Sequence, residues 1–242
     1  MRIGLVGNGK WGKKIKKKII ELGHSVKVIK KKDNLVDKLS NCNIIFVATP
    51  DDTHYKILKK IAILDKRTFC EKPVSRKLKD IKILNDFKKN KLYISDISNY
   101  YPNISLKKKN FFLREKFELR KNLFLTKRYD LLYRFAFHDF AYIYKKLGPL
   151  KFKKIKIIES KKILAFSLIN KKMIFEFCYK TNSKKKNYSL NGISFYTNKD
   201  ILKNMISNFI NKKMNFKTNI DKVKYVSKLI DKVKKEIQNS RN

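Results

Sequence analysis

The chain has 242 residues, of which 43% are hydrophobic, so it can build one large core or two modest ones. No apolar run approaches the roughly 18 residues that a membrane-spanning helix needs, which argues against a membrane partner. The formal net charge of +41 suits a nucleic-acid binder, but the excess is almost all lysine spread over every segment, as AT-rich codons would produce, so we expect no specific nucleic-acid site.

The first twelve residues predict a strand, a tight turn and a helix. The apolar run 3–6 leads into Gly7-x-Gly9-x-x-Gly12, and apolar residues at helical spacing follow. In this setting Gly7 allows the turn, Gly9 lets the backbone approach a pyrophosphate, and Gly12 lets the helix pack closely on the strand. The helix N-terminus would face the phosphates. This pattern is typical of dinucleotide binding.

A second strand is predicted over residues 26–29, and its end would meet the adenosine ribose. An acidic residue there binds the 2′-hydroxyl of NAD, whereas a basic residue suits the 2′-phosphate of NADP. Lys30 and Lys31 stand there, followed by Lys32 and Asp33. The lysines favour NADP slightly, but lysine is abundant everywhere in this chain, so both NAD and NADP stay open.

Strands and helices alternate up to about residue 98. Residues 43–48 form an unbroken apolar run typical of a buried parallel strand, and Pro50 stops it. A helix over 55–63, a strand over 67–70, a helix over 78–89 and a strand over 91–95 are predicted next. Repeated alternation of this kind indicates a doubly wound parallel sheet with right-handed crossovers. We therefore expect an α/β Rossmann dinucleotide-binding domain over 1–98.

The pattern changes in the second part of the chain. Residues 104–130 support no clear assignment, and a helix is predicted over 131–147, before Gly148. Strand-like runs follow at 153–158, 163–169, 173–179 and 188–196, and helices at 199–213 and 218–237. We expect residues 99–242 to form an α+β domain with an open, mainly antiparallel sheet, used for substrate binding and oligomerisation.

Two further features bear on the compartment. Glycines and a lysine interrupt the first apolar stretch after Val6, so it does not read as a signal peptide and we expect a cytoplasmic protein. Cys42, Cys70 and Cys178 lie far apart with no CxxC pair. We expect three reduced, partly buried thiols and no metal site.

Three motifs in this order and spacing resemble those of the Gfo/Idh/MocA oxidoreductases, which pair a nicotinamide-binding Rossmann domain with an open-sheet α+β domain. They are Gly7-x-Gly9-x-Trp11-Gly12, Ala48-Thr49-Pro50-x-x-Thr53-His54 and Cys70-Glu71-Lys72-Pro73. A fourth match is His138-Asp139-Phe140, on the predicted helix that ends at Gly148. Within the family, the tryptophan and the His-Asp pair look most like the branch that oxidises UDP-linked N-acetylhexosamine derivatives for surface polysaccharides.

The resemblance implies a set of site residues. Lys72 and His138 would be catalytic, since oxidation of a sugar alcohol needs a base for the hydroxyl proton as well as a hydride acceptor. Substrate would contact Lys72, Arg134, His138 and Asp139. The cofactor would contact Gly7, Asn8, Gly9, Lys10, Trp11, Gly12, Lys30, Lys31, Ala48, Thr49, Pro50, His54, Glu71, Lys72 and Pro73.

Some of these residues have structural alternatives. His54 could simply begin a helix, and Trp11 could pack under the first helix instead of near the pyrophosphate. His138 stands among phenylalanines, where a histidine is often part of the core. Many relatives have an aspartate where this chain has Arg134, which could pair with a substrate carboxylate or phosphate. The chain is also shorter than most members, with the loss in the second domain.

The sequence therefore predicts an NAD(P)-dependent oxidoreductase acting on a hydroxyl or keto carbon of a sugar or sugar nucleotide. The resemblance implies a homo-oligomer, a dimer or tetramer packed through the open sheet. A degenerate relative that binds nucleotide without hydride transfer, as a sensor or partner subunit, is the main alternative. A basic nucleic-acid-binding protein on the same scaffold is a weaker one.

Overall fold

The computed structural model describes residues 1–30, 33–116, 131–159, 163–181, 183, 186–196 and 200–240. The chain divides into two compact units, Met1–Ile97 with Lys199–Lys224, and Ser98–Asn198 with Tyr225–Asn242. The first break lies next to the boundary expected after residue 98. Residues 199–224 differ from the expectation, because they pack with the N-terminal unit.

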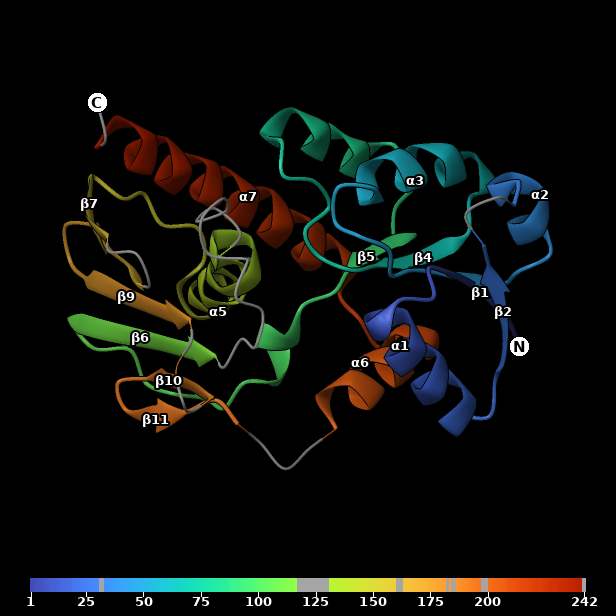
Figure 1. Ribbon diagram of the computed structural model, residues 1–242, viewed down its shortest axis with the longest axis horizontal. Helices are drawn as coiled ribbons and strands as arrows, with labels where there is room; N and C mark the ends of the chain where they lie inside the picture. Colours follow the sequence, from blue (N-terminus) through green and yellow to red (C-terminus); the bar gives the residue numbers. More distant parts are fainter. Residues whose placement is uncertain are drawn as a thin grey trace. The chain divides into compact units, whose positions relative to one another are not determined.

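The first unit is built on sheet A, whose strands are all parallel and follow the order β2-β1-β3-β4-β5. This doubly wound order confirms the predicted Rossmann fold. In Figure 1, α1 and α6 lie on one face of the sheet, and α2 and α3 on the other. The strands are β1 (Arg2–Val6), β2 (Ser25–Ile29), β3 (Ile44–Val47), β4 (Arg67–Cys70) and β5 (Leu92–Ile94). The helices are α1 (Lys10–Glu21), α2 (Leu35–Ser40), α3 (His54–Ile61) and α6 (Ile201–Ile210).

Aromatic packing explains why residues 199–224 join the first unit. Phe209 of α6 meets Phe46 and Phe69 of sheet A with ring centroids 5.5 and 5.4 Å apart. The start of α7 (Phe216–Asn239) adds Asn219, whose amide accepts from the Ile94 N–H at 2.8 Å and donates to the Ile94 carbonyl at 3.0 Å. Asn219 thereby satisfies the backbone of edge strand β5.

The expected helix over 78–89 is instead a 3₁₀-helix, Leu78–Asn85, that follows a short 3₁₀ turn, Ala62–Leu64, earlier in the unit. Its end is set by a turn, because the Lys91 N–H bonds to the Lys88 carbonyl at 3.1 Å and Asn90 has φ +65°. The chain must reverse there to enter β5, so the helix cannot continue to residue 89.

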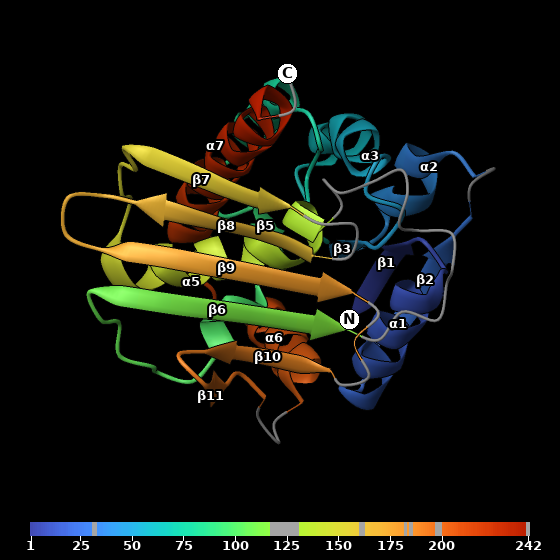
Figure 2. The ribbon, with the colours of Figure 1, turned by 60° about the vertical axis from the view of Figure 1, so that its left-hand side comes forward.

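The second unit is built on sheet B, whose strands follow the order β11-β10-β6-β9-β8-β7 (Figure 2). All neighbours are antiparallel except β6 and β9, which confirms a mainly antiparallel sheet. Strand β6 lies where the sequence supported no assignment. The strands are β6 (Lys109–Lys116), β7 (Lys154–Glu159), β8 (Ile163–Ile169), β9 (Ile174–Thr181), β10 (Asn187–Leu190) and β11 (Ile193–Ser194). A short 3₁₀-helix, Ile97–Tyr100, precedes them.

The core of the second unit lies between sheet B and α5 (Phe137–Leu147), which covers one face of the sheet in Figure 2. Phe177 stacks on Phe112 and Phe166 at 5.0 and 4.7 Å between ring centroids. Phe140 of α5 meets Phe177 edge-on at 5.3 Å. Aromatic side chains facing inward from alternate positions therefore hold the helix on the sheet.

Two further predictions need correction. The predicted helix 131–147 is a π-helical turn, Leu132–Ala136, followed by α5. The predicted strand 188–196 is a hairpin, because Asn191 and Gly192, at φ +52° and +83°, form a turn between β10 and β11. Such turns need two residues that tolerate positive φ, as Asn-Gly does. The three cysteines are free thiols, as expected.

Candidate active site

The glycine turn joins β1 to α1 and leaves room for a ligand. Gly7 has φ +107°, and a Cβ there would collide with the carbonyl of Ala48. A Cβ at Gly12 would collide with the carbonyl of Gly7, whereas one at Gly9 would have no protein atom within 4 Å. Gly9 is the N-cap of α1 and supplies no side-chain hydrogen bond to it. The turn therefore combines two internally crowded glycines with one that faces open space beside a helix N-terminus, as a bound pyrophosphate requires.

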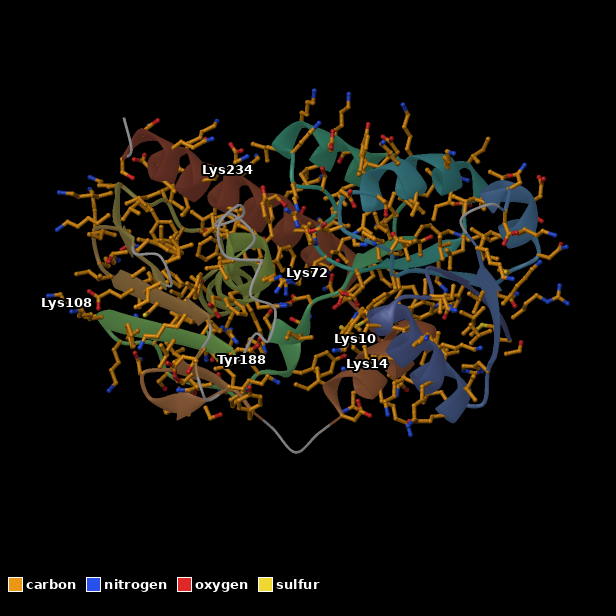
Figure 3. The ribbon with its side chains drawn as sticks, viewed as in Figure 1. Lys10, Lys14, Lys72, Lys108, Tyr188 and Lys234 are labelled. Atoms are coloured by element: carbon orange, nitrogen blue, oxygen red, sulfur yellow. The ribbon has the colours of Figure 1, made fainter. Side chains whose placement is uncertain are left out.

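The side chains in and after the glycine turn are exposed. Asn8, Lys10 and Trp11 all lie at the surface, and Figure 3 shows Lys10 and Lys14 at the start of α1. The Nζ atom of Lys14 lies 5.3 Å from the centroid of the Trp11 ring. These side chains are placed to meet a ligand at the carboxyl edge of sheet A.

His54 joins two loops at the same edge of sheet A. It is 1% exposed and is the first residue of α3. Its Nδ1 lies 2.7 Å from the carbonyl oxygen of Pro73, and its Nε2 lies 2.9 Å from that of Thr49. A neutral imidazole donates to one of these carbonyls at a time. His54 thus holds the loop after β3, with Ala48 and Pro50, against the loop after β4, and we assign it a structural role.

Glu71 follows β4 and is joined to the end of β3, beside the glycine turn. Its backbone N–H bonds to the Val47 carbonyl at 2.9 Å. The side chain is 8% exposed, and burial raises the pKa of its carboxyl, while hydrogen bonds from Trp11 and Ser95 and the positive charge of Lys72 oppose the rise. Lys72, the next residue, is half-buried and lies just after β4 in Figure 3. Ser95 was not foreseen from the sequence; its position after β5 was the available signal.

Lys30 and Asp33 lie just after β2, where the adenosine ribose of the cofactor is expected. The Asp33 carboxylate accepts a hydrogen bond from the backbone N–H of Lys30 at 2.7 Å, so an acidic group folds back to the end of β2. The Lys30 side chain is exposed. Lys31, the other residue expected there, lies outside the described residues.

The expected substrate residues of the second unit do not share one environment. His138 and Arg134 are partly exposed, and Arg134 belongs to the π-helical turn, where hydrogen bonds span five residues. In an α-helix, residues four positions apart lie on the same face. The π-helical turn alters this relation, so the spacing of Arg134 and His138 does not by itself place them on one face. Asp139 is 0% exposed. We take Asp139 out of the substrate contacts, because its carboxylate is occupied inside the core.

The partner of Asp139 is Arg114 of β6, which sequence reasoning missed. The Arg114 guanidinium donates from Nε to both carboxylate oxygens, at 2.9 and 3.2 Å, and from Nη2 to Oδ1. The Tyr179 hydroxyl donates to the other side at 3.0 Å. Burial lowers the pKa of Arg114, but the Asp139 carboxylate raises it further, so the pKa lies above its ordinary value. The sequence signal that could have indicated this pair is the scarcity of arginine in a lysine-rich chain, because arginine is well suited to buried bidentate pairs with carboxylates.

The comparisons with known proteins agree with this fold. Residues 13–94 match the oxidoreductase family Gfo/Idh/MocA, described by its NAD-binding Rossmann fold. No curated protein sequence matches the chain. None of the helices in the described part of the chain is long and apolar enough to span a membrane.

Several solved structures share the fold at low sequence identity. UDP-N-acetylglucosamine 3-dehydrogenase GnnA from Acidithiobacillus ferrooxidans has a TM-score of 0.78 and 12% identity over 96% of each chain. The WlbA (WbpB) dehydrogenase from Thermus thermophilus, solved with NAD and UDP-GlcNAcA, has a TM-score of 0.72 and 13% identity, covering 95% of this chain and 94% of its own. The dehydrogenase MviM from Clostridium difficile has a TM-score of 0.71 and 14% identity, covering 98% and 99%. Over residues 13–94, this chain therefore matches the Gfo/Idh/MocA family of oxidoreductases, with their NAD-binding Rossmann fold.

Proposed function

We propose that this chain transfers a hydride between a nicotinamide cofactor and a hydroxyl or keto carbon of a sugar or sugar nucleotide. The observation that carries the proposal is the position of Glu71-Lys72-Pro73. Glu71 bonds through its backbone N–H to Val47 of β3, which pairs with Val6 just before the glycine turn, and Pro73 is tied through His54 to the loop after β3. Lys72 therefore stands beside the place where the glycine turn would hold the cofactor.

The first unit offers candidate contacts for the pyrophosphate and for the adenosine ribose of the cofactor. The open space at Gly9 and the uncapped N-terminus of α1 suit the pyrophosphate, and Lys10 adds a positive charge. Asp33 is the candidate partner of the ribose hydroxyls in NAD, and Lys30 that of the 2′-phosphate in NADP. When bound, the nicotinamide supplies the hydride donor or acceptor.

The chain's own residues would handle the proton and the substrate. Lys72 is the proposed acid or base at the reacting oxygen, next to the buried carboxyl of Glu71. His138 is the proposed partner in proton transfer, and Arg134 the proposed contact for an acidic group of the substrate. Lys72 belongs to the first unit and the other two to the second.

The substrate class is supported by the structural relatives. GnnA is named as acting on UDP-N-acetylglucosamine, and WlbA was solved with UDP-GlcNAcA. A UDP-linked N-acetylhexosamine derivative is therefore the first substrate to test here. The likeness at 12% and 13% identity supports the fold of such enzymes, and the chemistry must be tested on this chain.

We also propose a homo-oligomer formed through the outer face of sheet B. This face presents Phe111, which is 40% exposed, with Leu113 two residues further along β6 and Ile169 two strands away on β8. Exposed apolar surface of this kind often marks an interface. Light scattering at several concentrations tests the proposal: a monomer throughout would contradict it.

The first experiment is binding of NADH and NADPH to the purified protein, followed by nicotinamide fluorescence at low and at about 0.15 M salt. Binding that survives the higher salt supports the site, and the tighter ligand decides between NAD and NADP. Oxidation of UDP-N-acetylhexosamine derivatives is then followed by NADH absorbance, with Lys72→Met against the matched exposed-lysine variant Lys79→Met.

We expect Lys72→Met to abolish turnover while cofactor binding persists, and Lys79→Met to behave as wild type. Turnover that is unchanged in Lys72→Met would refute the proposed proton transfer. Cofactor binding without turnover of any sugar derivative would favour the alternative of a nucleotide-binding relative that no longer transfers hydride.

A further inference from the structure

The amino edge of sheet A carries a second site, remote from the glycine turn. A groove of about 990 Å³ lies where β3, β4 and β5 begin, lined by Asn43, 65–67, 89–91 and 212–216. We call it the amino-edge groove. Gly7, Thr49 and Glu71 follow the carboxyl ends of β1, β3 and β4 in the same parallel sheet, so the groove and the proposed cofactor site lie at opposite edges of one sheet.

The groove concentrates positive charge beyond the average of this chain. Half of its lining residues are cations, against 61 of 242 residues overall, so lysine abundance alone does not account for it. The cations are Lys66, Arg67, Lys89, Lys91, Lys212 and Lys213.

Neutralising groups are scarce in the groove. Among the described residues that line it, Asp65 is the only carboxylate, and it is already held by Lys88 at 3.1 Å and Lys91 at 3.6 Å. Within the described part of the chain, Lys66, Lys89, Lys212 and Lys213 form no ion pair. Like charges gathered without counter-charges raise the local potential and attract anions.

The wall of the groove is held by the end of α6. The Lys212 N–H bonds to the Phe209 carbonyl at 3.2 Å, and the Lys213 N–H to the Asn208 carbonyl at 2.8 Å, the pattern of a Schellman cap. Lys212 has φ +57° at the position where glycine is usual. Arg67 donates to the carbonyls of Phe209 and Ile210 at 3.1 and 3.2 Å, which joins β4 to this cap. The backbone at both lysines is therefore fixed before any ligand binds.

A smaller groove of about 380 Å³ continues the first and shares Lys89, Asn90 and Phe216 with it. It adds two cations, Lys88 and Lys217, and one carboxylate, Asp221. The positive surface is thus longer than one phosphate group. Lysine ammonium groups act as point charges rather than as planar forks, which suits phosphates recognised by charge more than bases read by shape.

We propose that the amino-edge groove binds a linear run of phosphate groups, either free polyphosphate or the backbone of a single-stranded nucleic acid. The cofactor plays no part in this site, so the inference stands apart from the proposed function. It also differs from a general attraction of a basic protein to anions, because it assigns the binding to particular lysines.

The test compares two triple variants that remove the same charge. One changes Lys66, Lys89 and Lys212 to glutamine in the groove. The control changes Lys151, Lys153 and Lys156 to glutamine, exposed lysines of the second unit. Inorganic tripolyphosphate is titrated by calorimetry with NADH saturating, so that the cofactor site is not available to it. A fluorescent single-stranded oligothymidine is titrated in the second arm, over a range of salt concentrations.

We expect the groove variant to lose about tenfold or more in affinity and the control to stay close to wild type. In the oligonucleotide arm, the slope of log affinity against log salt should become shallower by about 2 in the groove variant alone. Loss with tripolyphosphate assigns free polyphosphate as a ligand, and loss with the oligonucleotide alone assigns a nucleic-acid backbone. Equal losses in both variants, or no binding to wild type at physiological salt, would overturn the proposal. Unchanged NADH affinity and thermal unfolding show that the groove variant is folded.

Discussion

Replacing Gly9 and Gly12 by alanine, one at a time, should separate cofactor binding from stability. A Cβ at Gly9 meets no protein atom within 4 Å, and the residue has φ −72°, which alanine adopts freely. A Cβ at Gly12 meets the backbone carbonyl of Gly7, which cannot swing aside as a flexible side chain could. The two substitutions add the same methyl group three residues apart, so each serves as the control for the other.

The expected stabilities differ by a margin that thermal unfolding resolves. For Gly9→Ala, the reduced freedom of the unfolded chain stabilises by about 0.4–1 kcal/mol, and the poorer N-cap costs about 1 kcal/mol. These terms nearly cancel, so the unfolding temperature should stay within about 4 °C of wild type. For Gly12→Ala, overpacking against backbone costs about 1–3 kcal/mol. A net loss of about 2 kcal/mol would lower the unfolding temperature by about 4–8 °C.

NADH affinity should fall more in Gly9→Ala than in Gly12→Ala, which is the reverse of the order expected for stability. If the pyrophosphate approaches Gly9, the added methyl group costs about 1–3 kcal/mol, or about 5- to 150-fold in affinity. The assay is NADH fluorescence titration on both variants below their unfolding temperatures. A Gly9→Ala protein that binds NADH as tightly as wild type would show that the pyrophosphate does not lie over this turn.

Three other substitutions test the remaining contacts. Asp139→Asn should cost about 3–5 kcal/mol in urea unfolding, because it leaves Arg114 charged and buried, and a double variant with Arg114→Met and Asp139→Leu should recover most of the loss. His54→Ala should lower the free energy of unfolding by about 1–3 kcal/mol and also weaken NADH binding, because two loops lose their link. A loss of stability with unchanged NADH affinity would show that His54 supports only the fold. Burial raises the folded-state pKa of Glu71 above its unfolded value near 4.5, so its contribution to stability is present below pH 4.5 and is lost as the pH rises through the raised pKa. Glu71→Gln should flatten the stability curve in that window, and an unchanged curve would contradict the assignment.

The sequence by itself determined the features that depend on neighbours along the chain. The turn at Gly7, Gly9 and Gly12 follows from residue spacing over a few positions, and the buried strand over 43–48 from an unbroken apolar run. The parallel order of sheet A follows from the alternation of strands and helices, because short right-handed crossovers leave few topologies. The family motifs likewise lie within short segments.

Only the tertiary structure decided which distant segments meet. The placement of α6 and Asn219 against sheet A joins residues more than a hundred positions apart, and no local periodicity encodes such a pairing. The pair between Arg114 and Asp139 changed a candidate substrate residue into part of the core, because burial depends on what packs around a side chain. The amino-edge groove arises in the same way. Its lysines come from separate turns, and only the folded sheet gathers them at one edge.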